Sequence, residues 1–204
     1  MSEMFKDKDD EGRRCCIKAG IVKALVNIFL KQDSSYIKVQ HAQAFNVLTY
    51  PTSNDVGLLI YSQFPFAGLL NLLDHTNKDV FEYAIISIWN IILAGTSTTP
   101  DSTQHPHFDT LATHEGIEKL YQFSNSWRTD DHYKNMAIVC IGNLYRAKMI
   151  EQADMRKEVI DRLKKLVNGS REWAKGESRH ALRYLAQNLV NKAERIKGGF
   201  VIPA

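Results

Sequence analysis

The chain has 204 residues, a length typical of one domain or of one short array of repeats. Hydrophobic residues make up 44% and charged residues 24%, with 11 glycines and 5 prolines, and this composition excludes a mainly disordered, collagen-like or linker-like chain. The formal net charge is only +3, yet residues 156–197 hold 12 lysines and arginines against 5 acidic residues, a local charge of +7.

The cysteines and the apolar segments indicate the compartment. The chain has three cysteines, of which Cys15 and Cys16 are adjacent, and this is not the pattern of a disulfide framework. The first residues are charged and lack the apolar core of a signal peptide. The longest apolar stretch, 83–95, has about 13 residues, whereas a membrane span needs roughly 20. We therefore expect an intracellular protein without a membrane span, in the cytoplasm or the nucleus.

Apolar residues recur at helical spacing in two registers, and nothing alternates with period 2 for long. The first register has a bulky apolar residue followed by leucine three positions later: Val22 and Leu25, Phe66 and Leu69, Ile117 and Leu120, Ile160 and Leu163. The second places an alanine before a bulky apolar residue, and these four anchor alanines are Ala44, Ala84, Ala137 and Ala181. They lie 40, 53 and 44 residues apart. Two registers with one period predict four helical repeats.

Turn residues between the helical stretches predict the limits of the repeats. We expect a flexible head at 1–10, repeats at 11–50, 54–95, 108–149 and 150–192, and a tail at 193–204. The larger middle spacing is explained by a loop insertion at 97–107, rich in Thr, Ser and Pro. We expect this loop to project, and its deletion to leave the fold intact.

The repeats resemble those of the armadillo family. Ala19-Gly20-Ile21-Val22 and Glu115-Gly116-Ile117 are similar to the glycine turn and second helix of an armadillo repeat. The stretches beginning at Ala84 and Ala137 are similar to its third helix, which ends in an asparagine that faces a groove, here Asn90 and Asn143. The resemblance implies an all-α, right-handed α-solenoid of about four repeats, of the type found in β-catenin and importin-α.

The resemblance also implies a non-enzymatic scaffold that binds a partner polypeptide along the concave surface of the third helices. The candidate groove residues are Tyr50, Tyr83, Asn90, Asn143, Arg183 and Gln187. Amides can bind the backbone of an extended peptide through both donor and acceptor. The alternative for Asn90 and Asn143 is a tethering role within their own repeats. An import receptor is disfavoured, because the positions of the importin tryptophans hold Ile86 and Val139.

Other functions have weaker support in the sequence. The basic segment 156–197 could bind an acidic partner or nucleic acid, but it lacks interleaved aromatic residues, and we expect nucleic-acid binding to be weak. His105 and His107, with Asp101, Asp109 and His114 nearby, are residue types that bind zinc, but a flexible loop is a poor metal site. We expect no cofactor, no metal, no small-molecule substrate and no enzymatic activity. Self-association through the ends of the solenoid is open.

Overall fold

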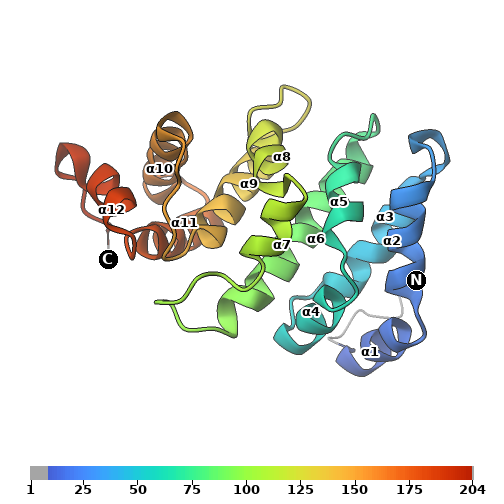
Figure 1. Ribbon diagram of the computed structural model, residues 1–204. Helices are drawn as coiled ribbons and strands as arrows, with labels where there is room; N and C mark the ends of the chain where they lie inside the picture. The colour runs from blue at the N-terminus through green and yellow to red at the C-terminus, as the bar shows by residue number, and fades with distance from the viewer. Residues whose placement is uncertain (1–8, 204) are drawn as a thin grey trace. The chain divides into compact units, whose positions relative to one another are not determined.

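The computed structural model describes residues 9–203, and that part of the chain is helical without a β-strand (Figure 1). The predicted head, 1–10, lies outside the described residues except for Asp9 and Asp10. The α-helices are α1 (Asp10–Lys18), α2 (Ile21–Lys31), α3 (Val39–Thr49), α4 (Asn54–Tyr61), α5 (Phe66–Leu72), α6 (Lys78–Ser97), α7 (Phe108–Thr113), α8 (Gly116–Ser124), α9 (Asp131–Leu144), α10 (Ala153–Val167), α11 (Glu172–Leu185) and α12 (Leu189–Ile196). Short 3-10 helices occupy Ser34–Tyr36 and Lys197–Gly199.

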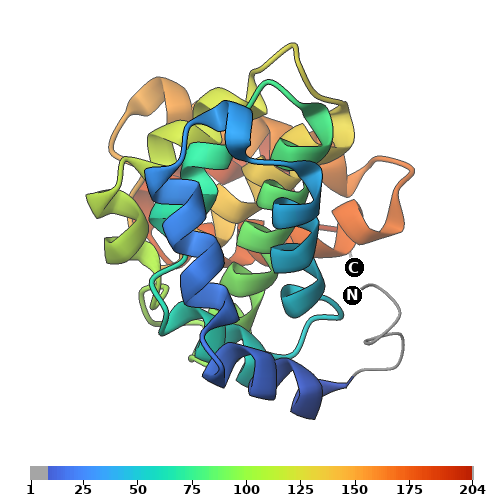
Figure 2. The same cartoon turned by 90° about the vertical axis from the view of Figure 1, so that its right-hand side faces the viewer.

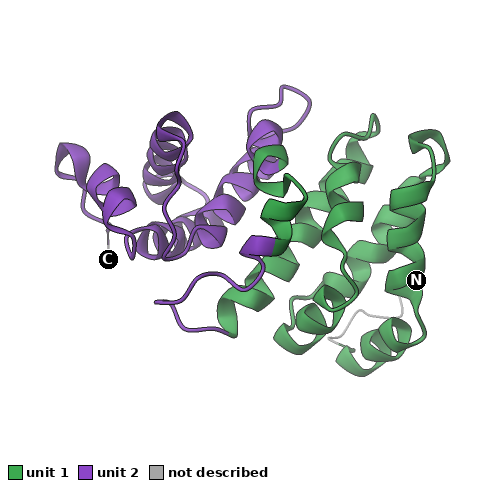
Figure 3. Ribbon diagram, viewed as in Figure 1, with its two compact units in different colours: residues 1–98, 110–119 green, residues 99–109, 120–204 purple. Residues whose placement is uncertain are grey.

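The helices form two compact units (Figure 3). Unit 1 comprises the chain up to Thr98 together with Thr110–Lys119, and unit 2 comprises Thr99–Asp109 together with the chain from Leu120 onward. Helices α1 to α6 belong to unit 1 and α9 to α12 to unit 2, whereas α7 and α8 are divided between the two units.

Unit 1 begins with a helix that is fixed by a buried arginine. The side chain of Asp9 accepts a hydrogen bond from the backbone N–H of Gly12 at 2.8 Å and so caps α1. Arg13 is fully buried, donates to the carbonyl oxygen of Pro51 at 2.6 Å and pairs with Asp10. This contact holds α1 against the segment between α3 and α4. Figure 2 looks onto this side of unit 1, where α2 and α3 lie beside one another and α1 crosses below them.

The core of unit 1 is built around α6, the longest helix described. By its length and composition α6 could cross a membrane, because an 18-residue stretch of it has a mean hydropathy of 1.4. However, 72% of that stretch is buried inside the protein. Burial of this extent is typical of a core helix, and α6 packs against α3, α4 and α5. The apolar stretch identified in the sequence is therefore the central part of a longer core helix.

The repeat pattern of the sequence corresponds to the helices. The four anchor alanines lie on α3, α6, α9 and α11 and are all buried, with at most 9% of their surface exposed. The first three repeats each contain three helices, and the fourth contains α10 and α11 without a preceding short helix. We call α3, α6, α9 and α11 the third helices of their repeats.

In the first three repeats, the turn between the first and the second helix contains a residue with a left-handed backbone conformation. These residues are Gly20 (φ 88°), Phe64 (φ 53°) and Glu115 (φ 53°). In the third repeat the sequence suggested that Gly116 makes the turn, but the left-handed residue is Glu115. Gly116 is needed for another reason: a Cβ there would lie 2.8 Å from side-chain carbons of Leu111 and Leu70. It allows α8 to begin in close contact with its neighbours.

The last described helix has an unusual distribution of side chains. In α12, Asn191 is fully buried, whereas Leu189 and Ile196 are 78% and 49% exposed. The Asn191 amide donates to the carbonyl oxygen of Lys148 at 2.8 Å and accepts from the N–H of Ile150 at 3.2 Å. Polar contacts therefore attach α12 to the rest of unit 2. The predicted tail at 193–204 differs from this result, since its first residues lie in α12.

Close packing between third helices gives the first testable prediction. A Cβ on Gly142 of α9 would lie 2.7 Å from the Cβ of Ala181 on α11, so Gly142→Ala should destabilise the protein by about 1–3 kcal/mol through overpacking. A Cβ on Gly176 of α11 would have no neighbouring atom within 4 Å. Gly176→Ala should therefore stabilise the protein by about 0.5–1 kcal/mol, because alanine favours the helix more than glycine does. Urea unfolding of both variants measures the difference. Equal effects of the two substitutions would contradict the proposed helix contact.

Candidate functional site

The candidate site residues lie on the third helices or directly after them. In unit 1, α3 and α6 pack side by side and are joined by side-chain hydrogen bonds. The Asn46 amide donates to the Ser87 hydroxyl at 3.3 Å, and the Ser87 hydroxyl donates to the carbonyl oxygen of Tyr83 at 2.7 Å. These bonds fix the register of α3 against α6, so the residues on their exposed faces have defined neighbours.

The two candidate tyrosines of unit 1 are accessible. Tyr50 directly follows α3 and is 63% exposed. Tyr83, on α6, is half-buried and lies one turn before the half-buried Ile86. Aromatic side chains that are accessible and held on a rigid helix are frequent binding anchors. The structure therefore places both tyrosines where a ligand of unit 1 can reach them.

Asn90 lies deeper than the tyrosines. It is 5% exposed, and its amide nitrogen donates to the Thr49 hydroxyl at 3.1 Å. Its amide oxygen accepts a hydrogen bond from the Thr52 hydroxyl, also at 3.1 Å. Both ends of the amide are used inside unit 1, where they connect α6 to the end of α3 and the segment after it. A ligand would have to compete with these two threonines for the amide.

Asn143 occupies the equivalent position on α9 but has different surroundings. It is 1% exposed, and neither its amide nitrogen nor its amide oxygen has a hydrogen-bond partner among the described residues. Met136 and Val139, on the same side of the helix, are also buried. Burying an amide without hydrogen bonds costs stability, so the buried side chain of Asn143 lowers the stability of the fold. This half of α9 contributes no accessible side chain.

The last third helix, α11, is open to solvent on one side. Arg183 and Gln187 are exposed, and His180, one turn before Arg183, is exposed as well. The opposite side of α11 is buried through Ala181, Leu182 and Leu185. The α11 residues therefore give unit 2 a polar, accessible face.

The inserted loop has exposed residues at 100–104 and is also anchored to unit 2. Its first residue, Ser97, belongs to α6, and the residues that follow are bound by the fully buried Arg146. The Arg146 guanidinium donates to the carbonyl oxygens of Thr103 at 2.8 Å and Thr99 at 3.3 Å, and to the Thr99 hydroxyl. Composition shows that a segment is not helical but does not show what binds it, and the effect of deleting the loop stays a prediction.

Two histidines of this loop are buried in unit 2, whereas residues 100–104 and Pro106 are exposed. The His105 and His107 side chains are both buried, with ring centroids 5.1 Å apart. Arg146 also stacks over the ring of Tyr184 at 5.6 Å. Burial raises the pKa of Tyr184, and the nearby carboxylate of Asp101 adds to the rise. The loop is thus part of the packing of unit 2, and its deletion should not be neutral.

Residues with metal-binding chemistry do not assemble into a cluster in the described part of the chain. Residues 9–203 hold no group of three or more His, Cys, Asp or Glu side chains placed to hold a metal ion. Cys140 is fully buried on α9, and burial raises the pKa of its thiol. Such a thiol is a packing residue, as the sequence indicated.

Two features of the site were missed at the sequence level. Arg146 follows α9 as an isolated cation, and nothing around it in the sequence predicts burial. Arg179 lies four residues before Arg183 on the open face of α11, next to His180. Here a signal existed, because cations recur every four residues at Arg171, Lys175, Arg179 and Arg183. That spacing places neighbouring members on adjacent turns of one helix.

Comparison with known proteins identifies the fold. No protein-family model and no curated protein matches the chain. Among solved structures, a designed armadillo repeat protein in complex with the peptide (KR)4 has a TM-score of 0.65 and 18% identity, over 97% of this chain and 78% of that chain. A computationally designed armadillo repeat protein for modular peptide recognition has a TM-score of 0.65 and 19% identity, over 93% of this chain and 75% of that chain. A further designed armadillo repeat protein gives a TM-score of 0.65 at 18% identity.

These similarities establish an armadillo-like repeat fold, an α-solenoid, for this chain. The fold class predicted from the two registers and the anchor alanines is confirmed. At sequence identities of 18–19% these comparisons establish the fold of the chain but do not identify its ligand. What the chain binds has to be argued from its own side chains.

Proposed function

We propose that the chain is a non-enzymatic binding scaffold that holds an extended segment of a partner protein on the open faces of its third helices. The fold supports this proposal, since one similar structure contains a bound peptide and another was designed for modular peptide recognition. Repeat proteins of this kind bind through surfaces to which successive repeats each contribute a helix.

The observation that carries the proposal is the distribution of accessible residues on α6. Every α6 residue that is not buried falls on one face of the helix when placed at 100° per residue: Lys78, Asp79, Glu82, Tyr83, Ile86, Leu93 and Ser97. The remaining positions form the core of unit 1. This face is interrupted at 87–92, where every residue is buried, so its accessible part is the first half of α6, which offers a rigid strip with an aromatic and an aliphatic residue. Tyr50 extends the accessible surface from the neighbouring third helix, α3.

The two units offer different chemistry on these faces. In unit 1 the face of α6 combines apolar contact from Tyr83 and Ile86 with the acidic Asp79 and Glu82. In unit 2 the face of α11 presents Arg183 and Gln187, which can donate hydrogen bonds to backbone carbonyls. Aromatic and arginine side chains are the types that most often dominate binding energy. We therefore assign the main contacts to Tyr83 and Arg183.

A peptide selection tests this function without knowledge of the natural partner. Random peptides of about twelve residues are displayed on phage and selected on the full chain, and the selected sequences are synthesised with a fluorescent label. We expect Tyr83→Ala or Arg183→Ala to weaken peptide binding about tenfold, because loss of a hot-spot side chain costs more than 1 kcal/mol. Fluorescence anisotropy measures the affinities.

Phe64→Ala is the matched control. Phe64 is 78% exposed but lies between α4 and α5, outside the third helices, so its removal should change affinity less than twofold. Circular dichroism and a melting curve establish that each variant is folded. Peptides whose binding depends on Phe64 and not on Tyr83 or Arg183 would place the binding surface elsewhere and reject the proposed function.

A further inference from the structure

The open face of α11 carries cations without acidic partners. Arg179 and Arg183 lie one turn apart on this face, flanked by His180, and neither arginine forms an ion pair or a side-chain hydrogen bond among the described residues. We call Arg179, His180 and Arg183 the α11 cationic strip. The one ion pair on this helix joins Lys175 to Glu172, at 2.7 Å, nearer its N-terminus.

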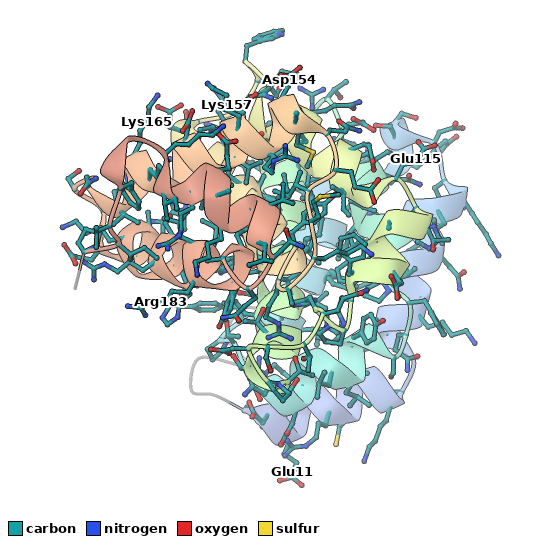
Figure 4. The ribbon with its side chains drawn as sticks, turned by 60° about the vertical axis from the view of Figure 1, so that its left-hand side comes forward. Glu11, Glu115, Asp154, Lys157, Lys165 and Arg183 are labelled. Atoms are coloured by element: carbon teal, nitrogen blue, oxygen red, sulfur yellow. The ribbon has the colours of Figure 1, made fainter. Side chains whose placement is uncertain are left out.

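The neighbouring helix α10 carries five cations and three acidic residues, and some of its cations are paired with acids. Lys157 pairs with Asp161 at 3.3 Å, and Arg162 pairs with Glu158 at 3.6 Å. Lys165 of α10, like Arg179 and Arg183 of α11, forms no ion pair among the described residues, so uncompensated charge lies on both helices. In Figure 4, Arg183 projects on one side of unit 2, and Lys157 and Lys165 project on the other.

The acidic residues of α11 compensate the strip only in part, because Glu172 pairs with Lys175 and also interacts with the charge of Arg179. Glu177 is half-buried, and burial raises the pKa of its carboxyl group, which disfavours the charged form. Asp101 lies near Tyr184 and the buried Arg146. Arg183 is exposed, whereas Arg179 is half-buried and its Nε is buried without a hydrogen-bond partner among the described residues. Arginine is suited to such a role, because its planar donor groups match carboxylate and phosphate oxygens.

We infer that the α11 cationic strip binds an acidic stretch of the partner polypeptide, in which Asp, Glu or a phosphorylated side chain recurs at alternate positions. This inference rests on the proposed function and specifies the ligand on unit 2. Where the bound segment runs along α11, the spacing supports it: side chains four residues apart on a helix are about 6 Å apart along its axis. Alternate side chains of an extended chain are about 6.8 Å apart, so successive acidic residues can meet successive arginines.

The same observations favour a polypeptide over nucleic acid. A duplex is bound through several phosphate contacts over a broad basic surface. Here the α11 cationic strip is one helix wide, and on α10 the carboxylates of Asp161 and Glu158 lie beside Lys157 and Arg162, where they would repel phosphates. Gln187, exposed just beyond α11, adds an amide suited to the backbone of an extended chain.

Four fluorescein-labelled probes of defined chemistry test the inference on the full chain. They are an alternating Gly-Glu peptide of about twelve residues, the same peptide with Lys in place of Glu, a Gly-phosphoserine peptide, and a duplex DNA of about twenty base pairs. We expect the Gly-Glu or the phosphoserine peptide to bind at least tenfold more tightly than the Gly-Lys peptide. Comparison of the two anionic peptides shows which acidic group the strip prefers.

Charge reversal at matched positions separates the strip from general electrostatic attraction. Arg179→Glu with Arg183→Glu should weaken the anionic peptides at least tenfold. Lys157→Glu with Lys165→Glu makes the same change in net charge on α10 and should weaken them less than threefold. Arg179→Gln with Arg183→Gln repeats the test without introducing acids, in case the reversed pair lowers stability. Melting curves accompany each affinity.

Each outcome has one interpretation. Equal losses for the α11 and α10 variants, or tighter binding of the Gly-Lys peptide, overturn the inference. Duplex DNA that binds more tightly than both anionic peptides at physiological salt, and depends on the strip, overturns it in favour of nucleic acid. If the phage-selected peptides depend on Tyr83 or Arg183 but are not acidic, the proposed function stands and the acidic ligand is rejected. If they depend on neither residue, the proposed function itself fails.

Discussion

Arg146→Met is expected to lower the free energy of unfolding by about 2–4 kcal/mol, because it removes a buried cation that makes several hydrogen bonds. The guanidinium of Arg146 binds both Thr99 and Thr103 and stacks on Tyr184, and its side chain is fully buried. Methionine keeps much of the apolar volume, so the loss reports the polar contacts with the loop. Urea unfolding monitored by circular dichroism measures it.

Arg183→Met is the control for this effect. It removes an arginine from the same unit, but from the exposed face of α11, so stability should change by less than about 0.5 kcal/mol. In the Arg146 variant, amides in and next to the loop should also exchange with solvent faster, since the loop loses its attachment. Unchanged stability together with unchanged exchange would show that the loop is held by other contacts.

The two asparagines of the third helices are expected to respond in opposite directions to the same substitution. Asn90→Leu breaks the hydrogen bonds to Thr49 and Thr52 and should destabilise the protein by about 1–3 kcal/mol. Asn143→Leu replaces a buried amide without partners by an apolar group of similar size, and should stabilise by about 1 kcal/mol. Thermal and urea unfolding of both single variants measure the effects.

The binding measurements give these variants a second use. If Asn143 contributes to a ligand site, the stabilised Asn143→Leu variant should lose affinity for the selected peptides while remaining folded. If it melts higher and binds normally, Asn143 has no part in binding. A lower melting temperature for Asn143→Leu would mean that leucine does not fit the space occupied by the amide.

The fold could be predicted because its determinants are local and periodic. Each anchor alanine marks a place where helices approach closely, and the leucines of the preceding helix recur at the same period. Such a pattern depends only on residue size and hydrophobicity, and the structure places Ala84, Ala137 and Ala181 in the core as expected. The positions of the third helices followed from it.

The remaining features depend on contacts between residues far apart in the sequence. Asn90 and Asn143 have the same place in the repeat, yet one is bound by two threonines and the other by none of the described residues. The threonines that bind Asn90 lie about forty residues away, and nothing in the repeat pattern marks them. Arg146 likewise binds a loop more than forty residues earlier in the chain. Periodicity predicts which side of a helix is buried but not which distant group satisfies a polar residue.

The division of the chain at residues 99–119 has a consequence for work with fragments. A piece that ends at Thr98 lacks Thr110, whose hydroxyl is hydrogen-bonded to Tyr61 of unit 1 at 2.8 Å. A piece that begins at Leu120 lacks Thr99 and Thr103, to which Arg146 of unit 2 is bound. The shortest fragment that completes unit 1 therefore ends at Lys119, and the shortest that completes unit 2 begins at Thr99. The two fragments overlap, so no single cut in the sequence yields both units whole.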